Sequence, residues 1–281
     1  MSAAARRLRV SQPSVSQTVA ALEQQVGAEL FVRSSSGVQL TEAGTVLAAE
    51  ARAVLARYDQ ALATVGRFAT AGDSTLRVGV PLELPADLLP RALKALAETH
   101  PRTRVMVRHL SSAAQLDALR DGELDVGLLR SRPPDRELDA IVVVEERLGV
   151  LLAATEPPAP EGVRLESLAG LDWVGFPRAD SPAWFDEIVA VLRSHGLQPG
   201  PAAAPGQSLI AEVKFAAVSA GQAFALAPEH WTQPLPSGVV WGALRGAPLV
   251  RRTWAVWAAD SRRRDLGHLI SELEPHRHLG P

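Results

Sequence analysis

The stretch that decides the fold reads RVSQPSVSQTVAALE, residues 9–23, and is followed by Gly27 and by LFVR at residues 30–33. Ser11 is a side-chain acceptor placed to cap a helix, and Pro13 falls in the first turn, where a missing backbone N–H costs nothing. Apolar side chains recur at spacings of four and three residues, at Val15, Val19 and Leu22. The pattern predicts a helix over residues 12–25 and is typical of the second helix of a helix-turn-helix.

The face of this helix opposite the apolar stripe carries small hydroxyl and amide side chains. Such groups near a helix N-terminus suit hydrogen bonds to phosphates and base edges in a major groove. We expect Arg33 to contact a phosphate or the minor groove beside the hairpin that follows. The alternative is the solvated face of an ordinary helix. The expected DNA-contacting residues are Ser11, Gln12, Pro13, Ser14, Ser16, Gln17 and Arg33.

Two short apolar runs and a long helical stretch follow. Residues 30–33 and 38–40 are expected to be strands, joined by the hydroxyl-and-glycine turn of residues 34–37 as in a wing. From Thr41 to Phe68 apolar side chains keep helical spacing. A helix of this length, with an apolar seam and no partner in its own domain, favours pairing with a second chain; packing on its own second domain is the alternative. The seam comprises Val46, Leu47, Ala51, Val54, Leu55, Tyr58, Leu62 and Val65.

The character of the sequence changes after the small polar linker at residues 71–74. Strands and helices then alternate, which predicts a mostly parallel sheet with helices on its faces. The expected elements are strand 76–80, helix 86–99, strand 104–108, helix 112–121 and strand 125–129, then strands 140–145 and 148–153 before a proline-rich crossover at 156–162. Strands and helices alternate again in a second lobe. The expected elements are strand 173–176, helices 181–195 and 208–220, strands 223–227, 239–241 and 253–258, and helix 265–273.

These elements predict an all-α/winged helix-turn-helix domain over residues 1–40, a long helix suited to dimerisation over 41–70, and an α/β domain of two lobes over 75–281, which the family resemblance given below implies to be the effector-binding domain. Lobe I takes about 75–155 and 250–281, and lobe II about 160–249. Two α/β lobes joined by two crossings form a hinged cleft. Small molecules bind such clefts where strand ends and helix N-termini converge.

Residues that open helices or end strands are the candidates for the cleft. Exposed N–H groups at helix starts suit a carboxylate or phosphate, although simple helix capping is the alternative. Glu83 is unusual among them, because its carboxylate would oppose an anion and favour an amine or hydroxyl group. The expected effector-binding residues are Pro81, Leu82, Glu83, Ser111, Ser112, Arg130, Arg178, Ser181 and Ser208. Trp173, Trp231, Trp241, Trp254 and Trp257 are interpreted as core and lobe-packing residues.

Composition excludes several classes of protein. The chain is 47% hydrophobic and 21% charged, as in ordinary soluble globular proteins, and it has no cysteine. A disulfide framework, a thiolate zinc site and a cysteine nucleophile are therefore excluded. Neither a signal peptide nor an apolar stretch of membrane-spanning length is present, so we expect a cytoplasmic protein without a membrane partner. Because G-x-S-x-G, H-E-x-x-H and a glycine-rich phosphate loop are missing, we expect no enzyme, no cofactor and no metal site.

The chain resembles the LysR-type transcriptional regulators of bacteria over essentially its whole length. The specific motif is VSQPSVS at residues 10–16, then Leu22-Glu23, Gly27, Leu30-Phe31, Arg33 and LTEAG at 40–44, with weaker matches at 119–126, 176–178, 181–182 and 219–221. The resemblance implies a winged helix-turn-helix, a dimerising linker helix and an effector domain like periplasmic solute-binding proteins. The implied partners are double-stranded operator or promoter DNA, a small-molecule co-inducer, and further copies in a homodimer or homotetramer, with RNA polymerase as another candidate.

The chain departs from the family at its amino end. Members of the family begin with a complete first helix. This sequence instead opens with MSAAARRL, inside what should be the second helix of the family's domain, the one that precedes the helix at residues 12–25. We therefore expect a truncated member whose apolar stripe at residues 15–22 is uncovered and whose DNA-binding domain is poorly stable. Gln17 and the serines at 34–36 stand where the family carries basic residues, which predicts reduced affinity for phosphates. The alternative function is a small-molecule-binding protein with a non-functional, truncated DNA-binding domain.

Overall fold

The computed structural model describes residue 5 and residues 10–34, 37–69, 74–155, 160–200, 209–229 and 234–274. The chain divides into two compact units, Met1–Gly66 and Arg67–Pro281. The opening residues 1–9, apart from Ala5, lie outside the described residues, as does Trp231.

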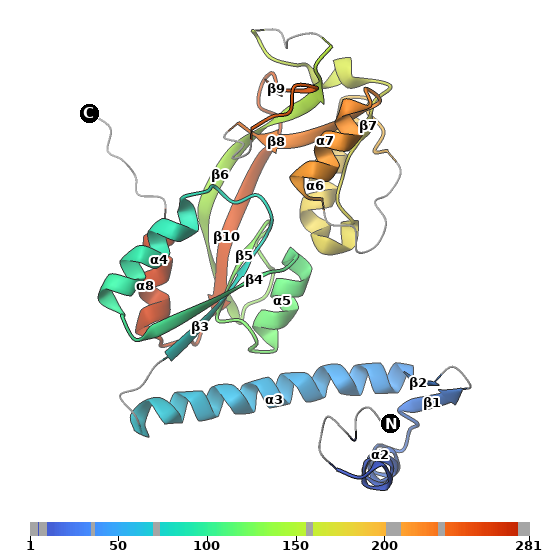
Figure 1. The fold of residues 1–281 in the computed structure, drawn as a ribbon, viewed down its shortest axis with the longest axis vertical. Coiled ribbons are helices and arrows are strands. Elements are labelled where there is room, and N and C mark those ends of the chain that lie inside the picture. The colour runs from blue at the N-terminus through green and yellow to red at the C-terminus, as the bar shows by residue number, and fades with distance from the viewer. Residues whose placement is uncertain are drawn as a thin grey trace. The chain divides into compact units, whose positions relative to one another are not determined.

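The first unit contains helix α2 (Gln12–Val26), a hairpin of β1 (Phe31–Ser34) and β2 (Gly37–Leu40), and most of helix α3 (Glu42–Ala69) (Figure 1). The cap predicted at Ser11 is confirmed, since its Oγ accepts a hydrogen bond from the Ser14 N–H at 3.3 Å. Gly27 ends the helix in the left-handed conformation, with φ of 73°. In α2, all of whose residues are described, none is buried, and Val15 and Val19 are half-buried.

Glu23 connects α2 to the hairpin. Its Oε1 accepts hydrogen bonds from the backbone N–H groups of Leu30 at 2.8 Å and Phe31 at 3.2 Å. The strands pair antiparallel, with Phe31 opposite Leu40, as the wing prediction requires. At the start of α3 the Thr41 Oγ1 accepts from the N–H of Gly44 at 2.9 Å. These contacts explain why an acidic residue, a hydroxyl and a glycine occur at these positions of the motif.

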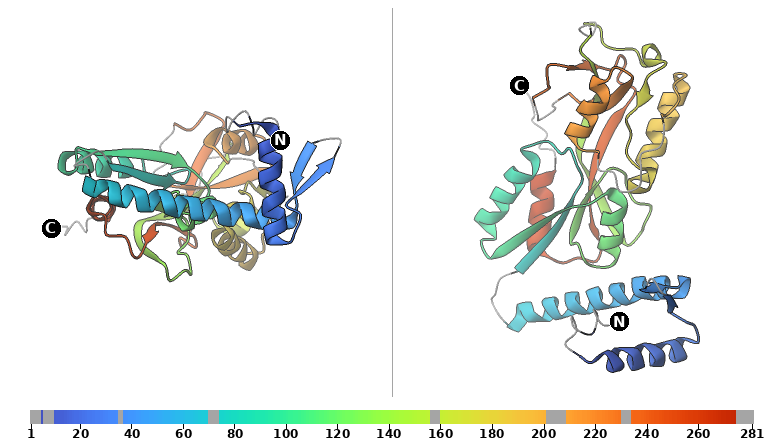
Figure 2. Two further views of the ribbon diagram at one scale, coloured as in Figure 1. Left: turned by 90° about the horizontal axis from the view of Figure 1, so that it is seen from below. Right: turned by 45° about the vertical axis from the view of Figure 1, so that its right-hand side comes forward.

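Helix α3 is continuous over its 28 residues (Figure 2), as its unbroken apolar period predicted. Five large side chains of its apolar seam are exposed. Between 53% and 67% of the surface of the following side chains is accessible to solvent: Val46, Val54, Leu55, Tyr58 and Leu62. A row of large apolar side chains on one helix face is a surface that association would cover.

The second unit is built on an eight-stranded sheet whose order is β4-β3-β5-β10-β6-β8-β7, with β9 also pairing with β6. Lobe I holds the parallel strands β3 (Ser74–Val80), β4 (Thr103–His109) and β5 (Val126–Leu129), with helices α4 (Leu88–Thr99), α5 (Ser112–Arg120) and α8 (Arg264–Leu273). Lobe II holds the 3₁₀ turns η1 (Leu165–Leu168) and η2 (Arg178–Asp180), strands β7 (Asp172–Trp173), β8 (Ala223–Pro228) and β9 (Val239–Ala243), and helices α6 (Pro182–Ser194) and α7 (Ala211–Ser219).

Two long antiparallel strands connect the lobes, β6 (Leu138–Ala153) and β10 (Val250–Ala258) (Figure 1). The prediction of separate strands at 140–145 and 148–153 is wrong, because the backbone continues through Glu146 and Arg147, which pair with β10. The sheet is also mixed rather than mostly parallel, since β10 runs antiparallel to both β5 and β6. Strand 173–176 shortens to two residues at β7. Local patterns could not show which distant strand each one pairs with.

Each lobe has its own apolar core. In lobe I the buried side chains of β3 and β5, including Leu76 and Leu128, pack against those of α4 and α8. In lobe II Trp173, Ile188 and Phe224 pack together between the sheet and α6. Among the described helices, none is both long and apolar enough to cross a membrane.

Candidate functional site

The exposed face of α2 is the first candidate site. Ser11, Gln12, Pro13, Ser14 and Gln17 are exposed, and Ser16 is half-buried, while Val15 and Val19 lie toward the less exposed side. The N-terminal end of the helix thus presents amides and hydroxyls to solvent, as a groove-reading helix requires. Arg33 lies on β1 opposite Val38, and its side chain is outside what the structure describes.

The second candidate site is a cavity of about 370 Å³ between the two lobes. Lobe I contributes the loop after β3, the start of α5 and the end of β5, and lobe II contributes η2, α6 and α7. The cavity brings together most of the predicted effector-binding residues: Pro81, Leu82, Glu83, Ser111, Ser112, Arg130 and Ser181. Their convergence follows from strand ends and helix N-termini meeting at one place in an α/β fold.

Part of the cavity lining is apolar and contains three aromatic side chains. It is formed mainly by lobe II and includes Leu148, Trp173, Phe176, Trp184, Ile188 and Leu226. The rings of Trp173 and Phe176 meet edge to face, with centroids 6.2 Å apart. Trp173 is therefore a core residue, as predicted, and also part of the cavity wall.

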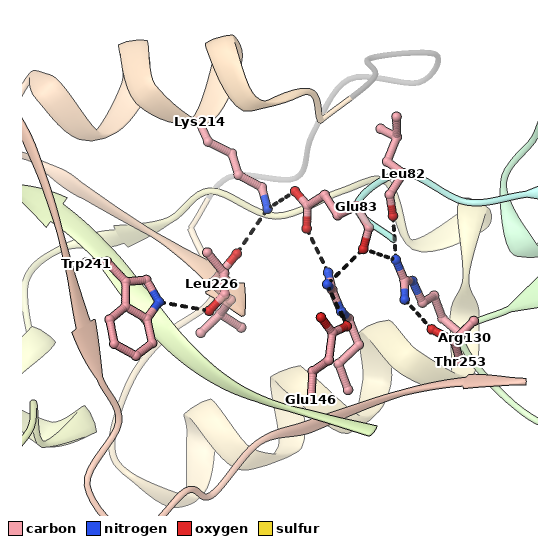
Figure 3. Close-up of polar contacts among 10 residues, drawn as sticks. Leu82, Glu83, Arg130, Glu146, Lys214, Leu226, Trp241 and Thr253 are labelled. Carbon is pink, nitrogen blue, oxygen red and sulfur yellow. Dashed lines mark hydrogen bonds and ion pairs between the residues drawn. The ribbon is translucent and has the colours of Figure 1, made fainter. Parts of the chain in front are cut away.

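Charged residues also meet at the cavity, in what we call the inter-lobe charge cluster: Glu83, Arg130, Lys214 and Arg251, which line it, and Glu146, which pairs with Arg251 (Figure 3). Glu83 lies at its centre. One carboxylate oxygen contacts the Lys214 Nζ at 2.5 Å, and the other accepts from the Arg251 Nη1 at 2.7 Å. Arg251 also binds Glu146 across the paired strands, Nη2 to Oε2, at 3.0 Å. Lobe I is thereby linked through Glu83 to α7 of lobe II.

Arg130 is held differently from the other two cations. Its guanidinium donates to the backbone oxygens of Leu82 and Glu83 and to the Thr253 hydroxyl. The backbone N–H of Arg130 donates to Ser112 Oγ at 3.0 Å. Among the described residues, no carboxylate lies within ion-pair distance of Arg130. The cluster holds three cations and two carboxylates, so it carries one surplus positive charge; Asp180, the other carboxylate that lines the cavity, lies outside the cluster in lobe II.

Burial and charge set the pKa values of this cluster. Burial alone would raise the pKa of Glu83, but the attraction of Lys214 and Arg251 outweighs it and lowers that pKa below 4.5. Burial lowers the pKa of Lys214, against the opposing effect of Glu83. Burial, together with the like charge of Arg251, lowers the pKa of Arg130 to about 9. Arg130 therefore remains a buried cation at neutral pH.

Ser181 supplies a polar group that is ready for a ligand. Its side chain is 5% exposed, and its Oγ has no hydrogen-bond partner among the described residues. It precedes Pro182, the first residue of α6, and makes no side-chain cap. Buried hydroxyl groups are nearly always hydrogen-bonded, so the Ser181 Oγ is a polar atom at the cavity wall that a water molecule or a ligand can satisfy.

One predicted residue does not line the cavity, and another lies outside the described residues. Arg178 is exposed and forms a two-pronged ion pair with Asp186 at 2.7 and 2.8 Å, which keeps its side chain on the surface. Ser208 lies outside the described residues. The expectation that the Glu83 carboxylate faces an incoming ligand directly also needs correction, because both of its oxygens are engaged by Lys214 and Arg251.

Local patterns missed Glu146, Trp184, Lys214 and Arg251. A signal for Lys214 was present: it is one of only two lysines in the chain, and it interrupts the apolar run between Val213 and Phe215. A charged residue in an apolar stretch is a candidate for a buried ion pair.

Two family profiles match the chain. The LysR substrate binding domain matches residues 70–276, and the lysR-family bacterial regulatory helix-turn-helix protein matches residues 1–45. A probable cat1 operon transcriptional activator of Acinetobacter lwoffii is 33% identical over 199 residues, which are 70% of this chain and 66% of that relative, just under two thirds of its length.

Two solved structures have the same fold. The LysR family transcriptional regulator CbnR aligns with a TM-score of 0.67 and 22% identity, over 97% of this chain and 92% of its own. The effector binding domain of BenM with its effector benzoate aligns with a TM-score of 0.60 and 21% identity, over 72% of this chain and 91% of its own. With both domains matched, the chain belongs to the LysR family and is a ligand-responsive, DNA-binding transcription regulator.

Proposed function

We propose that the effector of this regulator is a small carboxylic acid with an apolar or aromatic body, bound between the two lobes. The observation that carries the proposal is the surplus positive charge at Arg130, buried beside an aromatic wall. A buried cation without a carboxylate partner is unfavourable, and a bound anion offsets that cost. The carboxylate would lie near Arg130 and Ser181, and the apolar body would pack on Trp173 and Trp184.

The benzoate of BenM supports this class of ligand by analogy of fold. A further polar group at the cavity wall, the Asp180 carboxylate, would select among ligands. Asp180 lies half-buried at the cavity wall on the lobe II side and is a second place where a hydroxyl or amine substituent of the effector can bind. The proposed effector site comprises Pro81, Leu82, Ser111, Ser112, Arg130 and Ser181, with Trp173, Trp184 and Asp180 added from the structure.

On the DNA side, we infer that the exposed residues of α2 from Ser11 to Gln17 read the operator, together with Arg33 on the wing. We further infer that the exposed seam of α3 pairs two chains. Five large apolar side chains on one helix face support this, because a lone helix gains little from exposing them. A dimer would also place two α2 helices on successive half-sites.

Calorimetric titration with benzoate tests the effector site. The wild type should bind benzoate, and Arg130→Met should bind it at least about tenfold more weakly because a charge-assisted contact is lost. Arg178→Met is the matched control, since Arg178 lies outside the cavity and its loss should leave binding unchanged. Equal affinities of the wild type and Arg130→Met for benzoate would place the ligand elsewhere.

A gel-shift experiment separates the regulator from a small-molecule-binding protein without DNA function. The second function is favoured by one observation, the absence of any buried residue in α2. The wild type should retard DNA from upstream of its own gene, and Gln12→Ala with Gln17→Ala should weaken that binding. If neither protein shows a preference for this DNA over unrelated DNA at low salt, the second function is the better one.

A further inference from the structure

Glu83 holds an unusual position for a charged residue. Its backbone is in the left-handed region with φ of 60°, which glycine adopts without strain and a glutamate does not. Its side chain is only 17% exposed. A strained and buried glutamate is retained when its side chain makes contacts that a glycine could not.

Those contacts are with cations of the effector cavity. The carboxylate joins Lys214 of lobe II at 2.5 Å and Arg251 of the connecting strand β10 at 2.7 Å. The backbone oxygen of the same residue accepts from Arg130 and Arg251, each at 2.9 Å. In Figure 3 Glu83 and Lys214 point toward each other from the loop after β3 and from α7. Lys214 and Arg251 both line the cavity, and each is less than a tenth exposed.

We propose that Lys214 and Arg251 form an anion-binding subsite that the chain fills with its own Glu83 carboxylate, and that Glu83 thereby limits the effector to one negative charge. With Glu83 in place the inter-lobe charge cluster carries one surplus positive charge, which a monocarboxylate balances. Without it the surplus is two, and a second carboxylate of a ligand can take the vacated place. This specificity role rests on the proposed function, because it concerns the same cavity.

The direct test is chemical rescue in the full-length chain. Glu83→Gly removes the side chain, whose heavy atoms are those of a propionate molecule. Glycine tolerates the backbone conformation of this residue, so the backbone oxygen that Arg130 binds should stay in place. We expect a lower melting temperature for this variant and a recovery when millimolar propionate is added. Neutral propionamide, of the same shape, should not restore it. Glu145→Gly is the control, since Glu145 pairs with Arg252 on the surface and its loss leaves no buried cation.

The double variant Glu83→Gly with Lys214→Met should lose the recovery, because half of the subsite is gone. Propionate that raises the melting temperatures of the wild type, the Glu145→Gly control and the Glu83→Gly variant alike would overturn the proposal. So would propionamide acting as well as propionate. The rescue needs neither effector nor DNA, so its outcome is independent of whether benzoate binds the wild type.

A second measurement covers the case in which Glu83→Gly does not fold. Glu83→Gln keeps the shape of the side chain and removes its charge, so the surplus rises from one positive charge to two. Benzoate should then bind this variant about tenfold more tightly than the wild type, since removing a negative charge from a buried site strengthens its attraction for an anion. Unchanged or weaker benzoate binding by Glu83→Gln contradicts the proposal.

Discussion

Gly44 is predicted to be essential for the DNA-binding unit and irrelevant to the effector cavity. A Cβ added at this position would lie 2.0 Å from the Leu30 carbonyl oxygen, far inside the ordinary contact range of 3.4–4 Å. That oxygen cannot swing aside easily, because it accepts a hydrogen bond from the Thr41 N–H at 3.0 Å and Leu30 is only 2% exposed. Gly44→Ala must therefore push the start of α3 away from the hairpin.

The cost can be estimated from opposing effects. Forced overpacking costs about 1–3 kcal/mol. Loss of the Thr41–Leu30 hydrogen bond adds about 1–3 kcal/mol. Replacing a helical glycine by alanine returns only about 1 kcal/mol. The net loss is about 3 kcal/mol, which is a large fraction of the roughly 3–10 kcal/mol available to a unit of this size.

Calorimetric melting of the full-length chain, paired with gel shifts, measures this effect. The transition of the first unit should move to lower temperature and DNA binding should fall, while benzoate binding stays at the wild-type level. Gly267→Ala is the matched control: Gly267 lies within α8, and no atom is within 4 Å of its added Cβ. That variant should gain about 0.5–1 kcal/mol. If Gly44→Ala melts and binds DNA like the wild type, the steric reasoning is refuted.

Three further predictions concern association, the cavity and pH. Leu55→Glu places a charge on the exposed seam of α3, so light scattering should show monomers where the wild type shows dimers. Ser181→Ala removes a buried hydroxyl that lacks a partner among the described residues; the melting temperature should not fall, while benzoate binding weakens about fivefold. The pKa values of Glu83 and Asp265 lie below 4.5 and 3.8, so their stabilisation is complete above those values and lost as the pH falls further. Urea unfolding at pH 3 against pH 6 should show the loss, and Glu83→Gln should reduce it.

The helix-turn-helix could be predicted because its determinants are local. Ser11 caps the helix that begins at the next residue by accepting a hydrogen bond from the Ser14 N–H, and Gly27 ends that helix through its own backbone conformation. The predicted cavity residues came together for a similar reason, since helix starts and strand ends are visible in sequence and the fold places them at one edge. Reasoning of this kind placed Ser111, Arg130 and Ser181 correctly at the cavity.

The charge cluster could not be predicted in the same way, because its partners are far apart in the chain. Glu83 meets Lys214 across 131 residues and Arg251 across 168. Glu146 and Arg251 face each other only because β6 and β10 pair in one register, with Glu146 opposite Arg251. A single charged residue in an apolar stretch predicts that it has a partner but does not say which one.

The same two strands determine how a bound effector can act on the protein. Because β6 and β10 pair along nearly the whole length of β10, the lobes are joined by a hydrogen-bonded ribbon and not by free linkers. Their register shifts between Thr253 and Trp254, and Thr253 is the residue whose hydroxyl receives the Arg130 guanidinium. A ligand carboxylate that binds Arg130 would therefore act on the paired strands at their irregular point, where the twist is most easily changed. We predict that ligand binding and lobe orientation are coupled through that contact, so Thr253→Val should weaken the effect of benzoate on DNA binding more than it weakens benzoate binding itself.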